Sequence, residues 1–203
     1  MKSKLSAAVA AVGCLLAVSP ANAITVTLNL GATTSSVPGA VLFDDFDAVN
    51  NTSIGTITGG VLCSGVPGCG GFGTPPATGK FLGVFSSDGT TTIATVTFTN
   101  PVSYAGFAWG TPDPGNEVDV YNGSTLLGSF LGTTNVGPYY FNIFAGPGQA
   151  ITKLVLSSGC CFETDNFSAI PGLPTPIPGV GLPGLALILA GGLLWRRRQW
   201  LTP

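Results

Sequence analysis

The region after the first 23 residues alternates apolar and polar positions in short runs. In the first run, Ile24, Val26, Leu28 and Leu30 would lie on one face of a strand, with polar residues on the other. Turn-forming Gly, Pro, Asn or Ser residues bound the successive runs, and no window shows a sustained helical period. The pattern predicts an all-β domain over residues 24–170.

The regular spacing of these runs indicates an antiparallel β-sandwich of the jelly-roll kind. The pair Asn122-Gly123 favours a hairpin with a type I′ turn. The Gly-rich stretch 59–76 is expected to be a long surface loop, and residues 171–178 a Pro-rich linker. After the first run, strands are expected at 80–87, 91–100, 103–110, 116–123, 125–132, 139–145, 151–158 and 161–170.

Composition agrees with an extracellular β protein. Only 8% of the 203 residues are charged, against about 25% in typical soluble domains. The 45% hydrophobic content excludes a disordered chain. The region between the two ends is long enough for one domain with its own core.

The charges are segregated along the chain. Lys2 and Lys4 lie at the start and Arg196–Arg198 at the end, so the region between them has two lysines and all nine acidic residues, a net charge of −7. An acidic domain argues against nucleic acid as a partner. The absence of histidine excludes Ser-His and Cys-His catalysis.

The first 23 residues have the layout of a secretory signal peptide: a basic start, an apolar stretch and the small residues Ala21 and Ala23. We expect cleavage after Ala23 and export of the domain. A retained anchor helix is the alternative. Cys14 would be discarded with the leader, since Ala11 stands where a lipoprotein signal has Leu.

An uncharged apolar run, Gly179–Trp195, precedes the three terminal arginines. As a helix it would be about 26 Å long, enough for a bilayer core. Trp195 suits the membrane interface, and the arginines form a positive-inside stop. We expect a transmembrane segment within 179–203; an apolar helix of the domain core is the alternative, although the run has no polar face.

The prolines Pro174, Pro176 and Pro178, the Gly/Leu/Ala span and the Arg cluster Arg196, Arg197 and Arg198 resemble the PEP-CTERM sorting signal of Gram-negative bacteria. Thr or Ile stands between the prolines, where that signal usually has Glu. The resemblance covers about the last thirty residues. It implies that an exosortase cuts near Pro176 and Pro178 and releases the protein to the cell surface or an exopolysaccharide matrix.

Four cysteines remain after leader removal, Cys63, Cys69, Cys160 and Cys161. An even number in an exported protein predicts disulfides. Local pairing, 63–69 with 160–161, is favoured, although a bond between neighbours would be strained; pairing of each adjacent cysteine with the 63–69 loop stays open. A four-thiolate zinc site is a further alternative.

Acidic residues cluster at both ends of the domain: Asp44, Asp45 and Asp47 near its start, Glu163 and Asp165 near its end. The first and last strands of a sandwich are commonly neighbours, so the clusters could meet and bind Ca²⁺, which prefers oxygen ligands. The arrangement loosely resembles the structural calcium site of jelly-roll carbohydrate-binding modules. Solvated surface carboxylates are the alternative.

Aromatic residues on the expected strands are assigned to the core or its flanks, with a sugar-stacking platform as the alternative. The residues concerned are Tyr104, Phe107, Trp109, Tyr139, Tyr140 and Phe141.

These features favour a non-catalytic, exported surface or matrix protein that binds exopolysaccharide. Its partners would be the exosortase-type machinery and, at least transiently, the membrane. One alternative is a self-assembling structural protein of the envelope or biofilm, associating through strand edges. A glycoside hydrolase is another, with a carboxylate pair among Glu117, Asp119, Glu163 and Asp165. No residue is assigned as catalytic.

Overall fold

The structure is a computed structural model that describes residues 24–64, 76–85, 92–133, 137–159 and 161–172. These residues form eleven strands and no helix, so the predicted all-β class is confirmed. The strands are β1 (Thr25–Leu30), β2 (Val41–Asp44), β3 (Gly55–Gly59), β4 (Val61–Ser64), β5 (Lys80–Val84), β6 (Thr92–Trp109), β7 (Asn116–Asn122), β8 (Thr125–Leu131), β9 (Tyr139–Phe144), β10 (Ile151–Ser158) and β11 (Phe162–Pro171).

Every pair of these strands is antiparallel, as predicted. The long strand β6 joins two sets of pairings. Its first half pairs with β3 and β10, and its second half pairs with β9 and β11. Pro101, which has no N–H to donate, lies where the partners change. The two strands expected at 91–100 and 103–110 are therefore one strand, because the chain stays extended through the proline.

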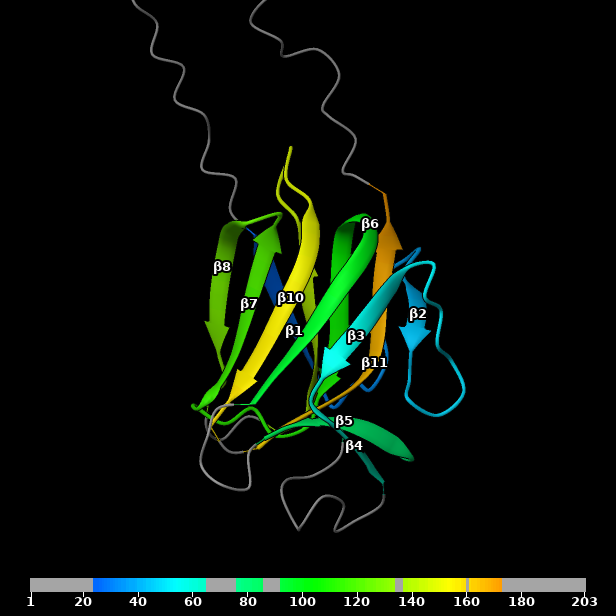
Figure 1. Ribbon diagram of the computed structural model, residues 1–203, viewed down its shortest axis with the longest axis vertical. Coiled ribbons are helices and arrows are strands. Elements are labelled where there is room, and N and C mark those ends of the chain that lie inside the picture. Colours follow the sequence, from blue (N-terminus) through cyan, green and yellow to red (C-terminus); the bar gives the residue numbers. More distant parts are fainter. Residues whose placement is uncertain (1–23, 65–75, 86–91, 134–136, 160, 173–203) are drawn as a thin grey trace, which may run out of the picture.

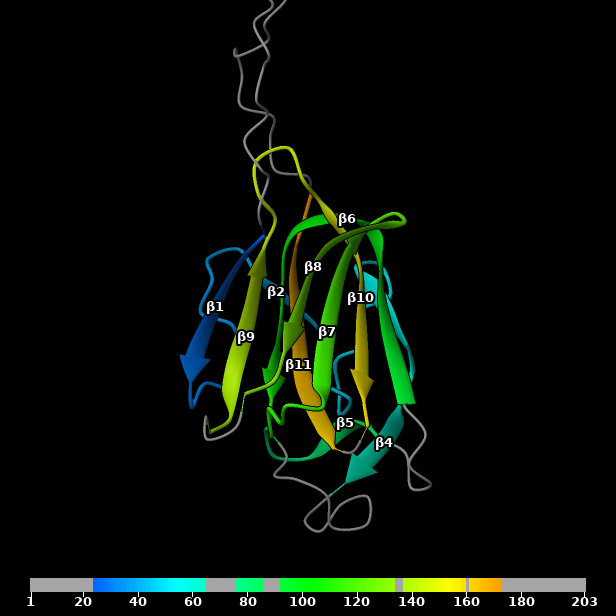
Figure 2. The same cartoon turned by 90° about the vertical axis from the view of Figure 1, so that its left-hand side faces the viewer.

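The first set of strands runs in the order β3-β6-β10-β7-β8. The second contains β1-β9-β6-β11, and the free edge of β11 pairs with β5 and β2. Figures 1 and 2 show β6 shared between these groups. Val118 and Leu154 from the first set and Phe141 and Phe167 from the second belong to one buried core.

Aromatic rings dominate the part of this core next to β11. Trp109 stacks on Phe162 with ring centroids 4.4 Å apart, and Phe107 stacks on Phe167 at 5.2 Å. All six aromatic residues assigned to the core by the sequence are at most 3% exposed, which confirms that assignment. Their rings are therefore not available as a sugar-stacking platform.

The hairpin between β7 and β8 is present, but its turn differs from the prediction. Asn122 pairs with Thr125, so Gly123 and Ser124 are the turn residues. Gly123 has a φ of 58° while Ser124 keeps a negative φ, which excludes type I′, where both central residues need a positive φ. A register shift lies between Val120 and Tyr121, just before this turn.

The stretch 59–76 is not a continuous loop. Gly59 ends β3, and Val61–Ser64 forms β4, which pairs with β5. Positive φ values at Gly59 and Gly60 make the tight turn between β3 and β4. Residues 65–75 lie outside the described ranges.

Within the described residues, no helix has the length and apolar character to cross a membrane. The expected leader, most of the linker and the expected transmembrane tail lie outside those residues.

Candidate functional site

The loop from Asp44 to Asn50 is held by one carboxylate. Asp45 Oδ1 accepts the backbone N–H groups of Asp47, Ala48 and Val49 at 3.0, 2.8 and 2.7 Å. Burial raises the pKa of Asp45, but these N–H groups outweigh it and hold the pKa below its ordinary value. The loop therefore has a fixed shape.

Phe46 lies in this loop with a φ of 57°. A bulky residue in the left-handed region is strained. The Phe46 N–H donates to Asp44 Oδ1 at 3.0 Å, and the ring packs edge-on against Phe167 of β11, centroids 5.9 Å apart. The backbone conformation of the loop thus holds the Phe46 ring against Phe167.

Pairing of β2 with β11 brings the two acidic clusters together. Asp45, Asp47 and Asp165 line one hollow of about 620 Å³, here called the acidic hollow. Thr33 and Asn166 also line it. The sequence predicted this approach on the ground that the first and last strands of a sandwich are neighbours. In the structure β1 pairs with β9 instead, and β2, which was not predicted, is the strand that pairs with β11.

Asp165 is 1% exposed, and its pKa is raised to about 7. Burial is the main cause, the N–H of Asn166 opposes it, and the negative charges of Asp47, Asp45 and Asp44 add to it. A cation among these carboxylates would relieve that repulsion.

The carboxylates that line the acidic hollow do not form a closely packed group. Among the described residues, no three His, Cys, Asp or Glu side chains are grouped closely enough to hold a metal ion. Both Asp47 oxygens instead accept the backbone N–H of Lys80, at 3.1 and 3.3 Å. The oxygen-only donor set suits Ca²⁺. Of the five carboxylates predicted as ligands, Asp45, Asp47 and Asp165 line this hollow, whereas Asp44 and Glu163 do not; calcium binding stays a prediction.

Glu163 is not part of the acidic hollow. It is 1% exposed, and neither carboxyl oxygen has a well-formed hydrogen bond in the part of the chain described. Its pKa is raised by burial, lowered in part by Thr111, and raised further by the negative charge of Asp113. Glu163 therefore faces the loop between β6 and β7, while Asp165 faces the loop after β2.

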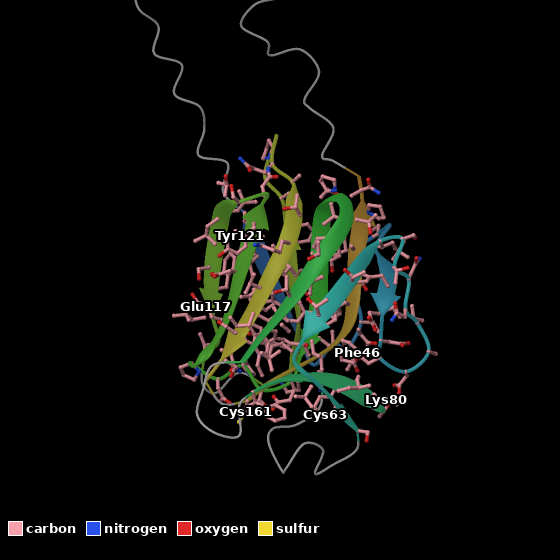
Figure 3. The ribbon with its side chains drawn as sticks, viewed as in Figure 1. Phe46, Cys63, Lys80, Glu117, Tyr121 and Cys161 are labelled. Atoms are coloured by element: carbon pink, nitrogen blue, oxygen red, sulfur yellow. The ribbon has the colours of Figure 1, made fainter. Side chains whose placement is uncertain are left out.

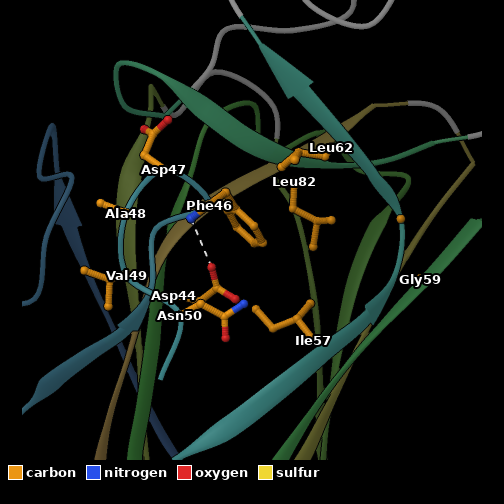
Figure 4. A pocket seen from close by; sticks show the side chains of 11 residues that line it. Asp44, Phe46, Asp47, Ala48, Val49, Asn50, Ile57, Gly59, Leu62 and Leu82 are labelled. Atoms are coloured by element: carbon orange, nitrogen blue, oxygen red, sulfur yellow. Dashed lines mark hydrogen bonds between the residues drawn. The ribbon is translucent and has the colours of Figure 1, made fainter. Parts of the chain in front are cut away.

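A second hollow lies on the other side of the same loop, and we call it the apolar hollow. Its volume is about 530 Å³. Figure 4 shows the ring of Phe46 and the side chains of Ile57 and Leu82 turned toward an open centre, with Asp44 and Asn50 at one end. Leu62, at the rim, is 56% exposed. The hollow thus combines apolar side chains with the carboxyl groups of Asp44 and Asp47 and the amide group of Asn50.

Glu117 and Asp119 lie on the outer face of β7, as expected from their alternation with the fully buried Val118 and Val120. The Ser129 hydroxyl of β8 donates to Asp119 Oδ1 at 2.6 Å and also contacts Glu117 Oε1. These two carboxylates are held side by side on a strand face rather than across a cleft.

Tyr121 lies on the same face, and Lys153 Nζ lies over its ring, 4.2 Å from the ring centroid. Figure 3 places Tyr121 and Glu117 on one side of the molecule, and Phe46 and Lys80 on the other. The face of β7 and the hollows beside Phe46 are therefore separate surfaces.

The cysteines are only partly covered by the structure. Cys63 and Cys161 are buried near one end of the molecule (Figure 3), while Cys69 and Cys160 lie outside the described residues. The disulfide pairing stays a prediction. The cleavage and sorting residues also lie outside: Ala21, Ala23, Pro176, Pro178, Arg196, Arg197 and Arg198.

Sequence reasoning missed the apolar hollow. Phe46 was visible only as an aromatic between acidic residues, and Asn50, Ile57 and Leu82 carried no distinguishing pattern.

No family model, no curated protein and no solved structure matches this chain.

Proposed function

We propose that the protein is a non-catalytic, exported protein of the cell surface or extracellular matrix that binds exopolysaccharide. Its leader would take it across the inner membrane, and its PEP-CTERM-like tail would anchor it until an exosortase releases it. The small-residue end at Ala21 and Ala23, the prolines and the Arg cluster support this route.

The domain is proposed to be a β-sandwich of the jelly-roll kind. Two sets of strands share β6, and the side chains of both sets contribute to one core. A sheet whose halves bury a common core in this way is the arrangement of a sandwich. Calcium bound by Asp45, Asp47 and Asp165 would have a structural role beside this core.

One observation supports the binding function most directly. The loop 44–50, which the Asp45 hydrogen bonds hold in shape and which we call the braced loop, has a hollow on each side. Binding sites are concave and largely pre-formed, with a few polar groups at fixed positions. Against a hydrolase, Glu163 and Asp165 face different loops, and Glu117 and Asp119 lie on an open strand face.

Self-assembly is the second candidate, favoured by apolar side chains on edge strands. Leu30 of β1 is 70% exposed and Leu131 of β8 is 64% exposed, and each of these strands pairs on one side among the described residues. Exposed edges are templates for association between chains.

The test of the proposal uses the protein purified from its producing cells and a column of the exopolysaccharide of those cells. Retention that free polysaccharide competes away supports binding. The same protein passing unretained, in calcium and in a chelator, would contradict the proposed binding. Concentration-dependent growth of the particle size without polysaccharide would favour self-assembly.

A further inference from the structure

We propose that the apolar hollow is a subsite for one pyranose unit of a polysaccharide. Phe46 would be the stacking surface, and Asp44 and Asn50 would bind the sugar hydroxyls. This inference rests on the proposed function and deepens it, because it names the place and the chemistry of recognition.

The hollow has the size and construction of a ligand site. Its volume of about 530 Å³ falls in the range of small-ligand pockets, roughly 300–1,000 Å³. Three separate segments form it: the braced loop with Phe46, the β3–β4 region with Ile57 and Leu62, and β5 with Leu82. All of its lining residues are among those described.

The chemistry of the wall matches the two faces of a pyranose ring. A pyranose exposes C–H groups on the faces of the ring and hydroxyl groups around its edge. The C–H groups pack well on an aromatic or aliphatic surface, which Phe46, Ile57 and Leu82 supply. Leu62, more than half exposed at the rim, would be covered by the bound sugar.

The polar end of the hollow has unused hydrogen-bonding capacity. Asp44 is 8% exposed; its Oδ1 accepts the Phe46 N–H, whereas Oδ2 accepts no hydrogen bond from any described residue. The Asn50 side-chain amide likewise has no hydrogen-bond partner within the described ranges. A carboxylate oxygen accepts and an amide both donates and accepts, so the pair can bind two neighbouring hydroxyls.

Backbone strain supports a binding role for Phe46. A φ of 57° is unfavourable for a bulky residue, and such strain persists where the surrounding structure imposes it, often at ligand sites. Here Asp44 and the three hydrogen bonds to Asp45 impose it. The ring is thus pre-oriented, which lowers the entropy lost on binding.

The rival aromatic surface is less suited to a sugar. Lys153 already covers one face of Tyr121, and Ser129 already binds Glu117 and Asp119. Tyr121 therefore provides a matched control for Phe46, since it is a partly exposed aromatic on a different surface (Figure 3).

The test measures binding of the full chain, purified from its producing cells, to the immobilised exopolysaccharide of those cells. We expect Phe46→Ala and Asn50→Ala each to weaken binding about tenfold. Tyr121→Ala should change it less than about twofold. Thermal unfolding of each variant shows whether the fold is kept, and Asn50→Ala decides the test if Phe46→Ala is unfolded, because Asn50 is exposed.

The outcomes separate this inference from the proposed function. Wild-type binding that Asn50→Ala and Phe46→Ala leave unchanged would overturn the subsite while the polysaccharide-binding function stands. Loss of binding in Tyr121→Ala alone would move the site to β7 and would also overturn the inference. Failure of the wild-type protein to bind would refute the proposed function and the subsite together.

Discussion

Asp47 and Lys80 join two loops that lie 33 residues apart in the chain. Both carboxylate oxygens of Asp47 accept the backbone N–H of Lys80, at 3.1 and 3.3 Å. The bond ties the braced loop 44–50 to the start of β5, and Asp47 lines both hollows. The Asp47 carboxylate therefore links the walls of both candidate sites to β5.

The first prediction concerns Gly79, which precedes Lys80 and has a φ of 106°. A Cβ at this position would collide with the Asp47 carboxylate, and the backbone conformation is itself unfavourable for other residues. We expect Gly79→Ala to lower the free energy of unfolding by about 1–3 kcal/mol, measured by urea denaturation.

Gly148→Ala is the matched control for this prediction. Gly148 has a φ of 75°, but an added Cβ would meet nothing within 4 Å. The free energy of unfolding of the Gly148→Ala variant should fall by only roughly 1 kcal/mol, which is the cost of the positive φ. Equal losses in the two variants would show that the contact with Asp47 contributes nothing.

The second prediction concerns calcium. If Asp45, Asp47 and Asp165 bind Ca²⁺, the ion at about 100 times its dissociation constant should stabilise the fold by about 2.7 kcal/mol. Asp165→Asn should abolish the shift in the thermal midpoint. Asp113→Asn, in another acidic loop, should leave it intact. A calcium shift of equal size in Asp165→Asn would contradict the assignment.

The third prediction is a pH dependence from Glu163. Its pKa is raised above the ordinary 4.5 in the folded state, mainly by burial, so the folded state holds the proton more tightly than the unfolded state. The contribution of Glu163 to stability therefore falls as the pH rises above 4.5 and levels off above its folded pKa. Glu163→Gln should remove this decline.

The measurement for this prediction is urea denaturation of both proteins between pH 4 and pH 8 in a chelator. The wild-type protein should lose stability relative to Glu163→Gln as the pH rises. A difference between the two proteins that stays constant across the range would mean that Glu163 keeps an ordinary pKa despite its burial.

Much of the fold could be predicted from alternation alone. The buried Val118 and Val120 show the period of a strand with one covered face. The run from Ile24 to Leu30 does form β1, but Leu28 and Leu30 are exposed, so its alternation does not mark a buried face. The short strands β2, β3 and β4 were missed. β4 lies in the Gly-rich stretch that was expected to be a loop, and β2 ends in the acidic cluster at Asp44. The continuity of β6 through Pro101 depends on its partners, not on its own residues.

The candidate site was less predictable. The approach of Asp45 and Asp47 to Asp165 followed from the positions of these residues near the two ends of the domain. The separation of Glu163 from Asp165 did not, because strand alternation gives the face of a side chain and not the loop that covers it. The role of Phe46 depends on a positive φ, which residue type does not reveal.

The most direct test of the account is the intact mass of the protein from its producing cells, measured with and without reductant. We predict a chain that begins at Ile24, ends near Pro176 or Pro178, and gains four hydrogens on reduction of two disulfides. A mass that retains Arg196, Arg197 and Arg198 would contradict release by an exosortase and would make the tail a permanent membrane anchor.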